Sequence, residues 1–360
     1  MKICYLANVQ SVHTQRWARH FSDRGHQVTV ISFQPGSIDN IPVIQVPRRT
    51  IWRRLDILLN INSVRKIVKD ISPDILHAHY VTSYGLAGAL ASKHPFVITV
   101  WGSDVLVTPE QSWIYRPLVG FALKQADLVT TTAPNATQHI IARKYAAATK
   151  IVTFPFGVDT DVFNPSIRNR KHRDGSSLII STRYFDHGSD LDIFIMAIQK
   201  VIRHYPNTRF LLVGDGPLRT KLEKLADRLK IKNYVEIRGE ISHWQMPALL
   251  GEADIYISTY PSDTNHVSLN EAMACGAFPV VTDIPANRAW IRQGENGLLF
   301  PCKDADNLAN AIVEALQKPE WRQSVMAENW NIVRTKASWS NSMAEMERHY
   351  RRLLGEKDHN

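Results

Sequence analysis

The chain has 360 residues, which suggests two domains at about 150 residues each. Its content of 44% hydrophobic and 21% charged residues is that of an ordinary globular protein. The three cysteines lack CxxC spacing, so we expect neither a metal site nor a disulfide framework, and a reducing, cytoplasmic compartment fits. The opening MKICYLANV lacks a signal-peptide layout, and no apolar run approaches the length of a membrane span.

The net charge of +9 is distributed unevenly along the chain. Residues 1–165 carry 17 Lys and Arg against 10 Asp and Glu, whereas the remainder carries 26 against 24. This excess predicts that the first half meets an anionic surface, either a membrane or a charged acceptor. We do not expect nucleic acid as a partner, because no recognisable nucleic-acid motif accompanies the basic residues.

The first residues predict a strand, a helix and a second strand in succession. The strand covers 2–7, the helix covers 11–24 with apolar residues at helical spacing, and Gly25 ends the helix before the strand at 26–32. His13 lies on the first helical turn. It faces either a ligand cleft or solvent, and the sequence leaves both interpretations open.

The segment 47–60, PRRTIWRRLDILLN, combines four arginines with apolar residues. As a helix it would place the apolar side chains on one face with the arginines beside them, which suits the interface of an anionic bilayer. An ordinary surface helix that packs on the sheet would show the same pattern. Both interpretations therefore stay open.

Two later strands of the first half end in polar residues. The strand DILHAHY carries His77 and His79, whose spacing of two places both side chains on one side of the strand. The surrounding sequence offers too few further ligands for a metal. The strand PFVITV ends at the loop Trp101-Gly102-Ser103-Asp104. Trp101 could belong to the core or to a site at this loop.

A polar stretch at 167–176, IRNRKHRDGS, predicts a linker to a second domain. The strand SLIIST after it ends at Arg183, which suits either an anion contact or a surface salt bridge. Another strand runs into the turn Gly214-Asp215-Gly216-Pro217. Its glycines allow a ligand to approach closely, although a tight strand-to-helix turn alone would also need them.

The segment 253–283 predicts a strand, a polar loop, a helix and another strand. Ser268 has Glu271 three residues later, which is the spacing of a capping box, and Gly276 ends the helix. A polar loop and a helix start at the end of a parallel strand are where open α/β sheets bind ligands, and free N–H groups there suit an anion. Glu271 is therefore either a capping residue or a ligand contact.

These motifs together resemble the retaining glycosyltransferases of family 4 (GT4), which have the GT-B fold. The matching stretches are EAMACG at 271–276 with Asp263 eight residues before it, the GDGP turn, and the run from Phe156-Gly157-Val158-Asp159 to Phe163-Asn164-Pro165. The resemblance covers about residues 1–354. It implies an α/β protein with two doubly wound, Rossmann-like domains facing across a cleft. The first domain, 1–166, would bind the acceptor and the second, 177–337, the donor, while a helix in 338–360 crosses back to the first domain.

The resemblance also implies an activity and a set of site residues. It implies transfer of a hexosyl or N-acetylhexosaminyl group, with retention and without a required metal or cofactor, from a UDP- or GDP-linked sugar. The acceptor would be a glycan, a lipid-linked or a small molecule, in polysaccharide or glycoconjugate synthesis in the cytoplasm or at the inner face of its membrane. Donor contacts would come from Arg183, His187, Gly214, Asp263, Thr264, Asn265, His266, Val267, Ser268 and Glu271, acceptor contacts from His13, His79 and Asp104, and catalytic roles from Asp263 and the Trp101 backbone.

The chain departs from the family pattern where the donor is expected to bind. The loop 8–12 has no glycine, Trp101 replaces a histidine, Asp263 replaces a glutamate, and no lysine follows Arg183. Arg183 should then dominate the ionic part of donor binding, with His187 as the nearest substitute for the lysine. Two alternatives remain: an atypical donor, or a degenerate GT-B protein that binds a ligand or partner without turnover.

Overall fold

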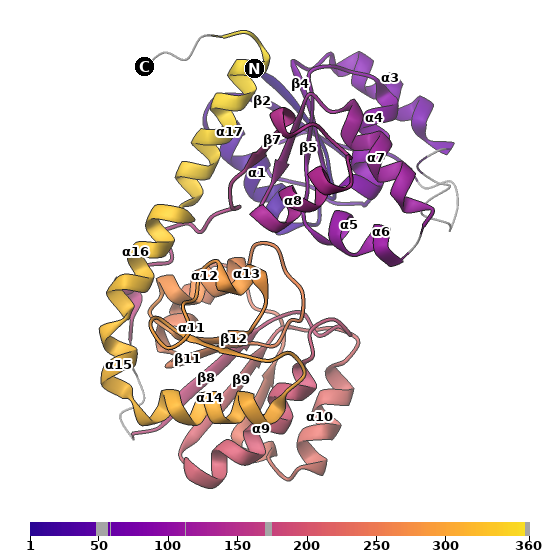
Figure 1. The fold of residues 1–360 in the computed structure, drawn as a ribbon. Helices are drawn as coiled ribbons and strands as arrows, with labels where there is room; N and C mark the ends of the chain where they lie inside the picture. The colour runs from indigo at the N-terminus through magenta and orange to yellow at the C-terminus, as the bar shows by residue number, and fades with distance from the viewer. Residues whose placement is uncertain (48–56, 58, 112, 170–174, 357–360) are drawn as a thin grey trace. The chain divides into compact units, whose positions relative to one another are not determined.

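The computed structural model describes residues 1–47, 57, 59–111, 113–169 and 175–356. It divides into two compact units, one of residues 1–155 with 342–360 and one of residues 156–341 (Figure 1). Most of the 47–60 segment, including its four arginines, and the middle of the 167–176 linker lie outside the described residues. No helix in the described ranges is long and apolar enough to cross a membrane.

The first unit is built on a seven-stranded parallel sheet in the order β3-β2-β1-β4-β5-β6-β7. The strands are β1 Lys2–Leu6, β2 Gln27–Ser32, β3 Val43–Gln45, β4 Ile75–His79, β5 Phe96–Thr99, β6 Leu128–Thr131 and β7 Ile151–Thr153. Tyr5 of β1 lies between Val30 of β2 and His77 of β4. The strand order reverses between β1 and β4, and this topological switch point is where such sheets open a crevice for ligands.

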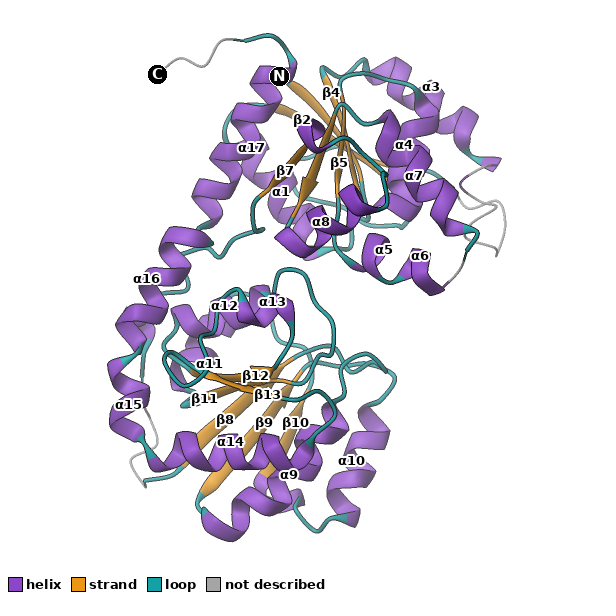
Figure 2. Ribbon diagram, in the orientation of Figure 1, coloured by secondary structure: helices purple, strands orange, loops and turns teal. Residues whose placement is uncertain are grey.

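Helices cover both faces of this sheet (Figure 2). They are α1 Val12–Asp23, α3 Ile61–Ile71, α4 Leu86–Ala91, α5 Ser103–Leu106, α6 Thr108–Gln111, α7 Tyr115–Gln125 and α8 Pro134–Ala142. Side chains alternate along β1, so Cys4 and Leu6 join the core beneath α3, α4 and α7, whereas Tyr5 packs against Trp17 of α1. The small-residue helix expected after β4 begins as a π-helical turn, Val81–Gly85, before α4.

The last helix, α17 Trp339–Leu353, packs on the first unit from Ser342 onward. Met343, Met346 and Tyr350 form its fully buried face, as the helical spacing predicts. The Tyr350 hydroxyl lies 3.3 Å from the Tyr5 hydroxyl and 2.5 Å from Nδ1 of His77. A buried polar contact of this kind fixes the position of the helix on the sheet as well as its burial does.

The stretch from Phe156 to Pro165, expected at the end of the first domain, belongs to the second unit. The Val158 N–H donates to Ala337 O over 2.6 Å, and the Trp339 N–H donates to Val158 O over 2.8 Å. Gly157 has a φ of +82°, and a Cβ there would lie 2.7 Å from the Trp339 backbone. Main-chain pairing with a segment far along the sequence thus assigns this stretch, and no local pattern announces it.

The second unit has a six-stranded parallel sheet in the order β10-β9-β8-β11-β12-β13. Its strands are β8 Ser177–Thr182, β9 Thr208–Val213, β10 Val235–Arg238, β11 Ile255–Ser258, β12 Phe278–Thr282 and β13 Leu298–Phe300. Its helices are α9 Leu191–His204, α10 Arg219–Arg228, α11 Met246–Glu252, α12 Val267–Ala274, α13 Pro285–Arg288, α14 Ala305–Gln317, α15 Pro319–Ser324 and α16 Met326–Lys336. One core lies under α9, α10 and α14, and the other under α11, α12 and α16. Here the strand order reverses between β8 and β11. Both units are therefore doubly wound α/β domains, as predicted.

Candidate functional site

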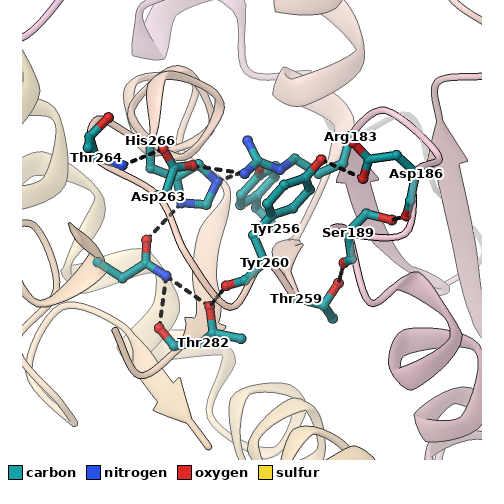
Figure 3. Close-up of polar contacts among 11 residues, drawn as sticks. Arg183, Asp186, Ser189, Tyr256, Thr259, Tyr260, Asp263, Thr264, His266 and Thr282 are labelled. Carbon is teal, nitrogen blue, oxygen red and sulfur yellow. Dashed lines mark hydrogen bonds and ion pairs between the residues drawn. The ribbon is translucent and has the colours of Figure 1, made fainter. Parts of the chain in front are cut away.

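Arg183 and Asp263 meet at the switch point of the second unit. Arg183 follows β8 and Asp263 follows β11, and these strands are neighbours in the sheet. Nη2 of Arg183 donates to Oδ2 of Asp263 over 2.9 Å (Figure 3). The guanidinium also lies 3.8 Å from the centroid of the Tyr260 ring. Its Nε is buried and has no hydrogen-bond partner among the described residues. The structure thus brings together two predicted site residues and holds the arginine on two sides.

Each member of this ion pair keeps the other charged. Burial alone raises the pKa of Asp263, but Arg183 and then His266 reverse this effect, and the pKa is lowered below 3.8. Burial likewise lowers the pKa of Arg183, and Asp263 more than compensates, so that pKa is raised. The Arg183 side chain is only 14% exposed, so water screens its charge weakly. The site therefore presents a buried, permanently charged guanidinium.

The GDGP turn packs against the backbone that follows Arg183. A Cβ at Gly214 would lie 2.2 Å from the Arg183 carbonyl oxygen, and one at Gly216 would lie 2.5 Å from that of Phe185. The Phe185 N–H donates to Asp215 O over 2.9 Å. Side chains are excluded at both glycines because the two turns touch. This contact explains the glycines without a ligand, and it makes Gly214 a residue that positions Arg183.

The helix after Asp263 starts earlier than the sequence predicts. Its N-cap is His266 and its first residue is Val267, so Ser268 lies within the first turn, and the expected capping box with Glu271 is wrong. The His266 carbonyl already accepts from the Asn270 N–H over 3.1 Å. Tertiary contacts to the His266 ring fix this start, and the local Ser-Glu spacing could not reveal them.

The His266 ring is held by Asn287 of α13 and Tyr256 of β11. Nδ1 lies 2.8 Å from the Asn287 side-chain oxygen, and Nε2 lies 3.4 Å from the Tyr256 hydroxyl. The Asn287 amide in turn donates to Thr282 O over 2.8 Å. Burial, followed by Arg183, lowers the pKa of His266 to about 4. His266 is therefore a neutral, fixed support for the loop.

The loop leaves one amide with unused capacity. Both side-chain polar atoms of Asn265 are buried and have no hydrogen-bond partner in the described ranges. The neighbouring Thr264 N–H instead donates to Oδ1 of Asp263 over 2.7 Å. Buried polar groups without partners are rare in folded proteins, and a ligand is one way to satisfy them. Asn265 is thus the strongest of the predicted loop contacts.

Glu271 and His187 occupy different settings. Glu271 is buried in α12 at 7% exposure, and it acts with Asp263 on the hydroxyl of Tyr256 at the base of the site. His187 is exposed on the turn between β8 and α9. The group beside Arg183 is instead Tyr260, whose hydroxyl donates to Asp186 over 3.0 Å (Figure 3). The sequence analysis did not include Tyr260, although an aromatic residue directly after a buried strand is a signal that could have identified it.

A cavity of about 580 Å³ lies at the switch point of the first unit. It opens beside the residues that follow β1 and β4, and it lies wholly among residues of this unit. Its lining residues are Asn8, Ser11, Thr14, Phe33, Gln34, Ile57, His79, Tyr80, Thr82, Ser83, Tyr84, Trp101 and Tyr115. Two predicted site residues, His79 and Trp101, are therefore part of one cavity wall.

Three predicted residues of the first unit form an aromatic group. The His13 ring meets Trp101 edge-on at 5.3 Å between centroids, and the His79 ring lies 6.0 Å from Trp101. His77 and His79 lie on one side of β4, as predicted, with ring centroids 4.8 Å apart. Burial, followed by the effect of His13, lowers the pKa of His79 to about 3. His79 is thus a neutral imidazole at physiological pH.

Asp104 fixes the Trp101 loop from below. Its carboxylate accepts from the N–H groups of Val81 at 2.8 Å, Gly102 at 2.8 Å and Trp101 at 3.1 Å. Burial raises its pKa to about 6, although these donors act in the opposite direction. Asp104 is fully buried and does not line the cavity. Its contribution to the site is therefore to hold two loops in place. Among the described residues, no group of three or more His, Cys, Asp and Glu could hold a metal ion.

Two family models match the chain, one on each half. The model described as Glycosyl transferase 4-like matches residues 2–133, and the model described as Glycosyl transferases group 1 matches residues 176–318. Phosphatidyl-myo-inositol mannosyltransferase of Mycolicibacterium smegmatis is 24% identical over 370 residues, which cover 96% of this chain and 90% of that protein.

Two further comparisons cover different shares of the chain. One protein of the phosphatidylinositol N-acetylglucosaminyltransferase of Arabidopsis thaliana is 25% identical over 196 residues, or 54% of this chain. Those residues cover 43% of the plant protein, so this chain matches less than half of its length. The structure of Anabaena HepE in complex with UDP-glucose matches with a TM-score of 0.79 at 19% identity and covers 99% of each chain. At this identity the likeness shows the fold, and it agrees with the predicted pair of doubly wound domains.

Proposed function

Because the chain belongs to the GT4-like glycosyltransferases of GT-B fold, we propose that it moves a sugar from a nucleoside diphosphate to an acceptor. The sugar is a hexose or an N-acetylhexosamine, the anomeric configuration is retained, and no metal is required. The product belongs to polysaccharide or glycoconjugate synthesis. UDP is the first donor nucleotide to test, since the structurally similar Anabaena protein was solved with UDP-glucose, and GDP is the second.

The observation that carries this proposal is the buried guanidinium of Arg183. A diphosphate needs cationic donors, and a planar arginine fork binds phosphate oxygens better than neutral groups do. Asp263 engages Nη2 of Arg183, while the buried Nε has no partner in the described ranges and suits a phosphate oxygen. The N–H groups at the start of α12 add neutral donors, because the first turn of a helix leaves its N–H groups unpaired. These groups together offset the diphosphate charge without a metal.

The remaining donor contacts follow from the same loop. Asp263 and the buried amide of Asn265 bind sugar hydroxyls, with the backbone of Thr264 to Val267 around them. Glu271 accepts from the ribose hydroxyls. Gly214 acts by holding the Arg183 turn, and His187 contributes at most a peripheral contact from its exposed position.

The reaction proceeds on one face of the sugar. The acceptor hydroxyl attacks the anomeric carbon from the side on which the diphosphate leaves, the bond to the diphosphate oxygen breaks, and the hydroxyl proton passes to a leaving phosphate oxygen. The Trp101 backbone stabilises the developing positive charge. The acceptor binds to the first unit near His13 and His79, while Asp104 holds the Trp101 loop.

We also propose that the first unit touches the inner face of the cytoplasmic membrane. The basic excess of residues 1–165 and the arginines of the 47–60 segment suit anionic lipid. The named substrate of the mycobacterial relative is itself a lipid. Sedimentation with anionic liposomes tests this proposal. Replacing Arg48, Arg49, Arg53 and Arg54 by Gln should release the protein, and a parent protein that ignores such liposomes at moderate salt would exclude the contact.

A donor panel tests the activity. Purified protein should transfer or slowly hydrolyse one nucleotide-sugar of a UDP- and GDP-linked set, and NMR of the product should show the donor's anomeric configuration. Arg183→Lys should reduce turnover, and Arg183→Ala should abolish it. The matched control is Arg292→Ala, an exposed arginine of the same unit that pairs with Glu295 and Glu328. Unchanged turnover in Arg183→Ala would overturn the proposed donor site. Nucleotide binding without hydrolysis or transfer of any donor would favour the degenerate alternative.

A further inference from the structure

The cavity at the switch point of the first unit has a neutral lining. Of the described residues that line it, none is Asp, Glu, Lys or Arg. Five are aromatic, namely Phe33, Tyr80, Tyr84, Trp101 and Tyr115, and six carry hydroxyl or amide groups, namely Asn8, Ser11, Thr14, Gln34, Thr82 and Ser83. Its volume of about 580 Å³ lies within the range of about 300–1,000 Å³ that is usual for small-molecule sites.

Two buried side chains of this lining have polar atoms without partners. Both ring nitrogens of His79 and the Oγ1 of Thr14 have no hydrogen-bond partner among the described residues. His79 is 2% exposed and Thr14 is 1% exposed, so bulk water does not satisfy them. Orphaned buried donors and acceptors are costly, and each calls for an explanation. Their position on the wall of one cavity indicates that a ligand supplies the missing bonds.

The backbone of this wall is also held in unusual conformations. Tyr80 has a φ of +75°, which is strained for a residue with a side chain, and the π-helical turn Val81–Gly85 follows it directly. The Tyr80 N–H donates to Thr99 O over 3.1 Å, and Asp104 accepts from the Val81 N–H. Strain that surrounding contacts maintain is concentrated at functional sites. Here it places Tyr80, Thr82 and Ser83 on the cavity wall.

We propose that this cavity binds a neutral, polyhydroxylated ring, either a sugar unit or a cyclitol, as the acceptor end of the substrate. His79 and Thr14 bond to ring hydroxyls, and the aromatic side chains cover the apolar faces of the ring. The word acceptor rests on the proposed function, whereas the binding of the ring does not. A phosphate does not suit this lining, because its charge would be buried without a cation. The acceptor thus meets the enzyme through a neutral ring and not through the phosphate of a carrier.

Ligand-observed NMR tests the binding without any turnover. The probes are methyl glycosides of common hexoses and N-acetylhexosamines, myo-inositol, the corresponding ring phosphates and inorganic phosphate. We expect at least one neutral ring to bind the full-length protein. Thr14→Val and His79→Phe should weaken that ring at least tenfold and leave UDP or GDP binding unchanged. Thr29→Val, a matched substitution on β2 away from the lining, should bind the ring like the parent.

Kinetics with the functional donor complete the test. The two cavity variants should raise KM for the acceptor while donor hydrolysis without acceptor stays at the parent rate. Melting curves show which variants are folded, and Thr14→Val, which keeps its volume, serves if His79→Phe is unstable. Equal ring affinity in parent and variants, or binding of phosphates alone, would overturn the proposal. A ring that binds and is weakened by both variants, with no transfer from any donor, would leave the cavity assignment standing and remove the proposed function.

Discussion

The two units place their candidate sites at the same topological position and fill it with opposite chemistry. In the second unit, the residues after β8 and β11 supply a buried ion pair, Arg183 with Asp263. In the first unit, the residues after β1 and β4 line a cavity with aromatic and hydroxyl groups and the neutral imidazole of His79. The sheet topology fixes where a ligand binds. The side chains at the strand ends decide which ligand it is.

The contrast also divides the substrate into two parts. A diphosphate is recognised by permanent charge, and a sugar or cyclitol ring is recognised by hydroxyl contacts and shape. A transferase needs both kinds of recognition, since its donor is an anion and its acceptor presents a hydroxyl group. The predictions below test whether charge matters in the second unit and whether neutrality matters in the first.

The largest effect is expected from Asp263→Asn. The change leaves the buried guanidinium of Arg183 without its carboxylate, and the loss of one partner of a buried ion pair costs about 3–5 kcal/mol. Differential scanning calorimetry should show a lower Tm for the second unit. Added nucleoside diphosphate should raise the Tm of the variant more than that of the parent, because the diphosphate replaces the missing negative charge.

The matched control for this experiment is Asp283→Asn, which breaks the exposed pair with Arg288 in the same unit. Exposed pairs contribute about 0–1 kcal/mol, so this variant should melt like the parent. A parent-like Tm for Asp263→Asn would show that the ion pair does not define the second site, and the contrast between the units would fail.

Gly214→Ala should have the next largest effect. The new Cβ would lie 2.2 Å from the Arg183 carbonyl oxygen, at a residue with a φ of +144°. Either the GDGP turn or the Arg183 turn must move, so nucleotide affinity should fall at least tenfold, and stability should fall by about 1–3 kcal/mol. Isothermal titration with UDP or GDP measures the affinity. Gly188→Ala is the control, because a Cβ there would meet nothing nearer than 3.5 Å. Equal affinity in both variants would remove Gly214 as a residue that positions Arg183.

Glu271→Gln should have a smaller effect, confined to binding. Glutamine has almost the same shape as glutamate, so the buried position in α12 should tolerate it with little change in Tm. One acceptor oxygen becomes a donor, and nucleotide affinity should fall severalfold because the ribose hydroxyls lose an acceptor. The reason given by the sequence, that Gln suits a capping box, no longer applies, since Ser268 does not cap the helix. An unchanged affinity would take Glu271 out of the donor site.

The sequence predicts the elements of both sites better than their side-chain partners. Strand β11, helix α12 and strand β12 end close to their predicted positions, because apolar runs and Gly276 are local signals. The partners of His266 and the contact of Gly214 with Arg183 involve residues far apart in the chain, and no spacing rule encodes them. For the same reason, the sequence suggested that Asp104 contacts ligand, whereas the structure shows that its carboxylate binds three backbone N–H groups.

The smallest effect concerns pH and the neutrality of the first site. His77 and His79 are fully buried, and burial lowers the pKa of each, to about 3 for His79. Below the usual histidine pKa of about 6.5, the unfolded chain binds protons that the folded chain excludes. Stability from these residues is therefore complete above about pH 6.5 and is lost as the pH falls toward 3. Each such histidine contributes a slope of about 1.4 kcal/mol per pH unit within this window.

The comparison with the second unit makes this slope specific. The Arg183–Asp263 pair stays ionised over the same window because the pKa of Asp263 lies below 3.8, while the buried His266, with a pKa of about 4, adds a slope that both proteins share. His79→Phe should therefore reduce the fall in Tm between pH 7 and pH 5 without removing it. Thr14→Val alters the same cavity without removing a titrating group, so it should keep the slope of the parent. If His79→Phe kept the full slope as well, His79 would have to bind a proton in the folded protein. The first site could then not be the neutral counterpart of the second.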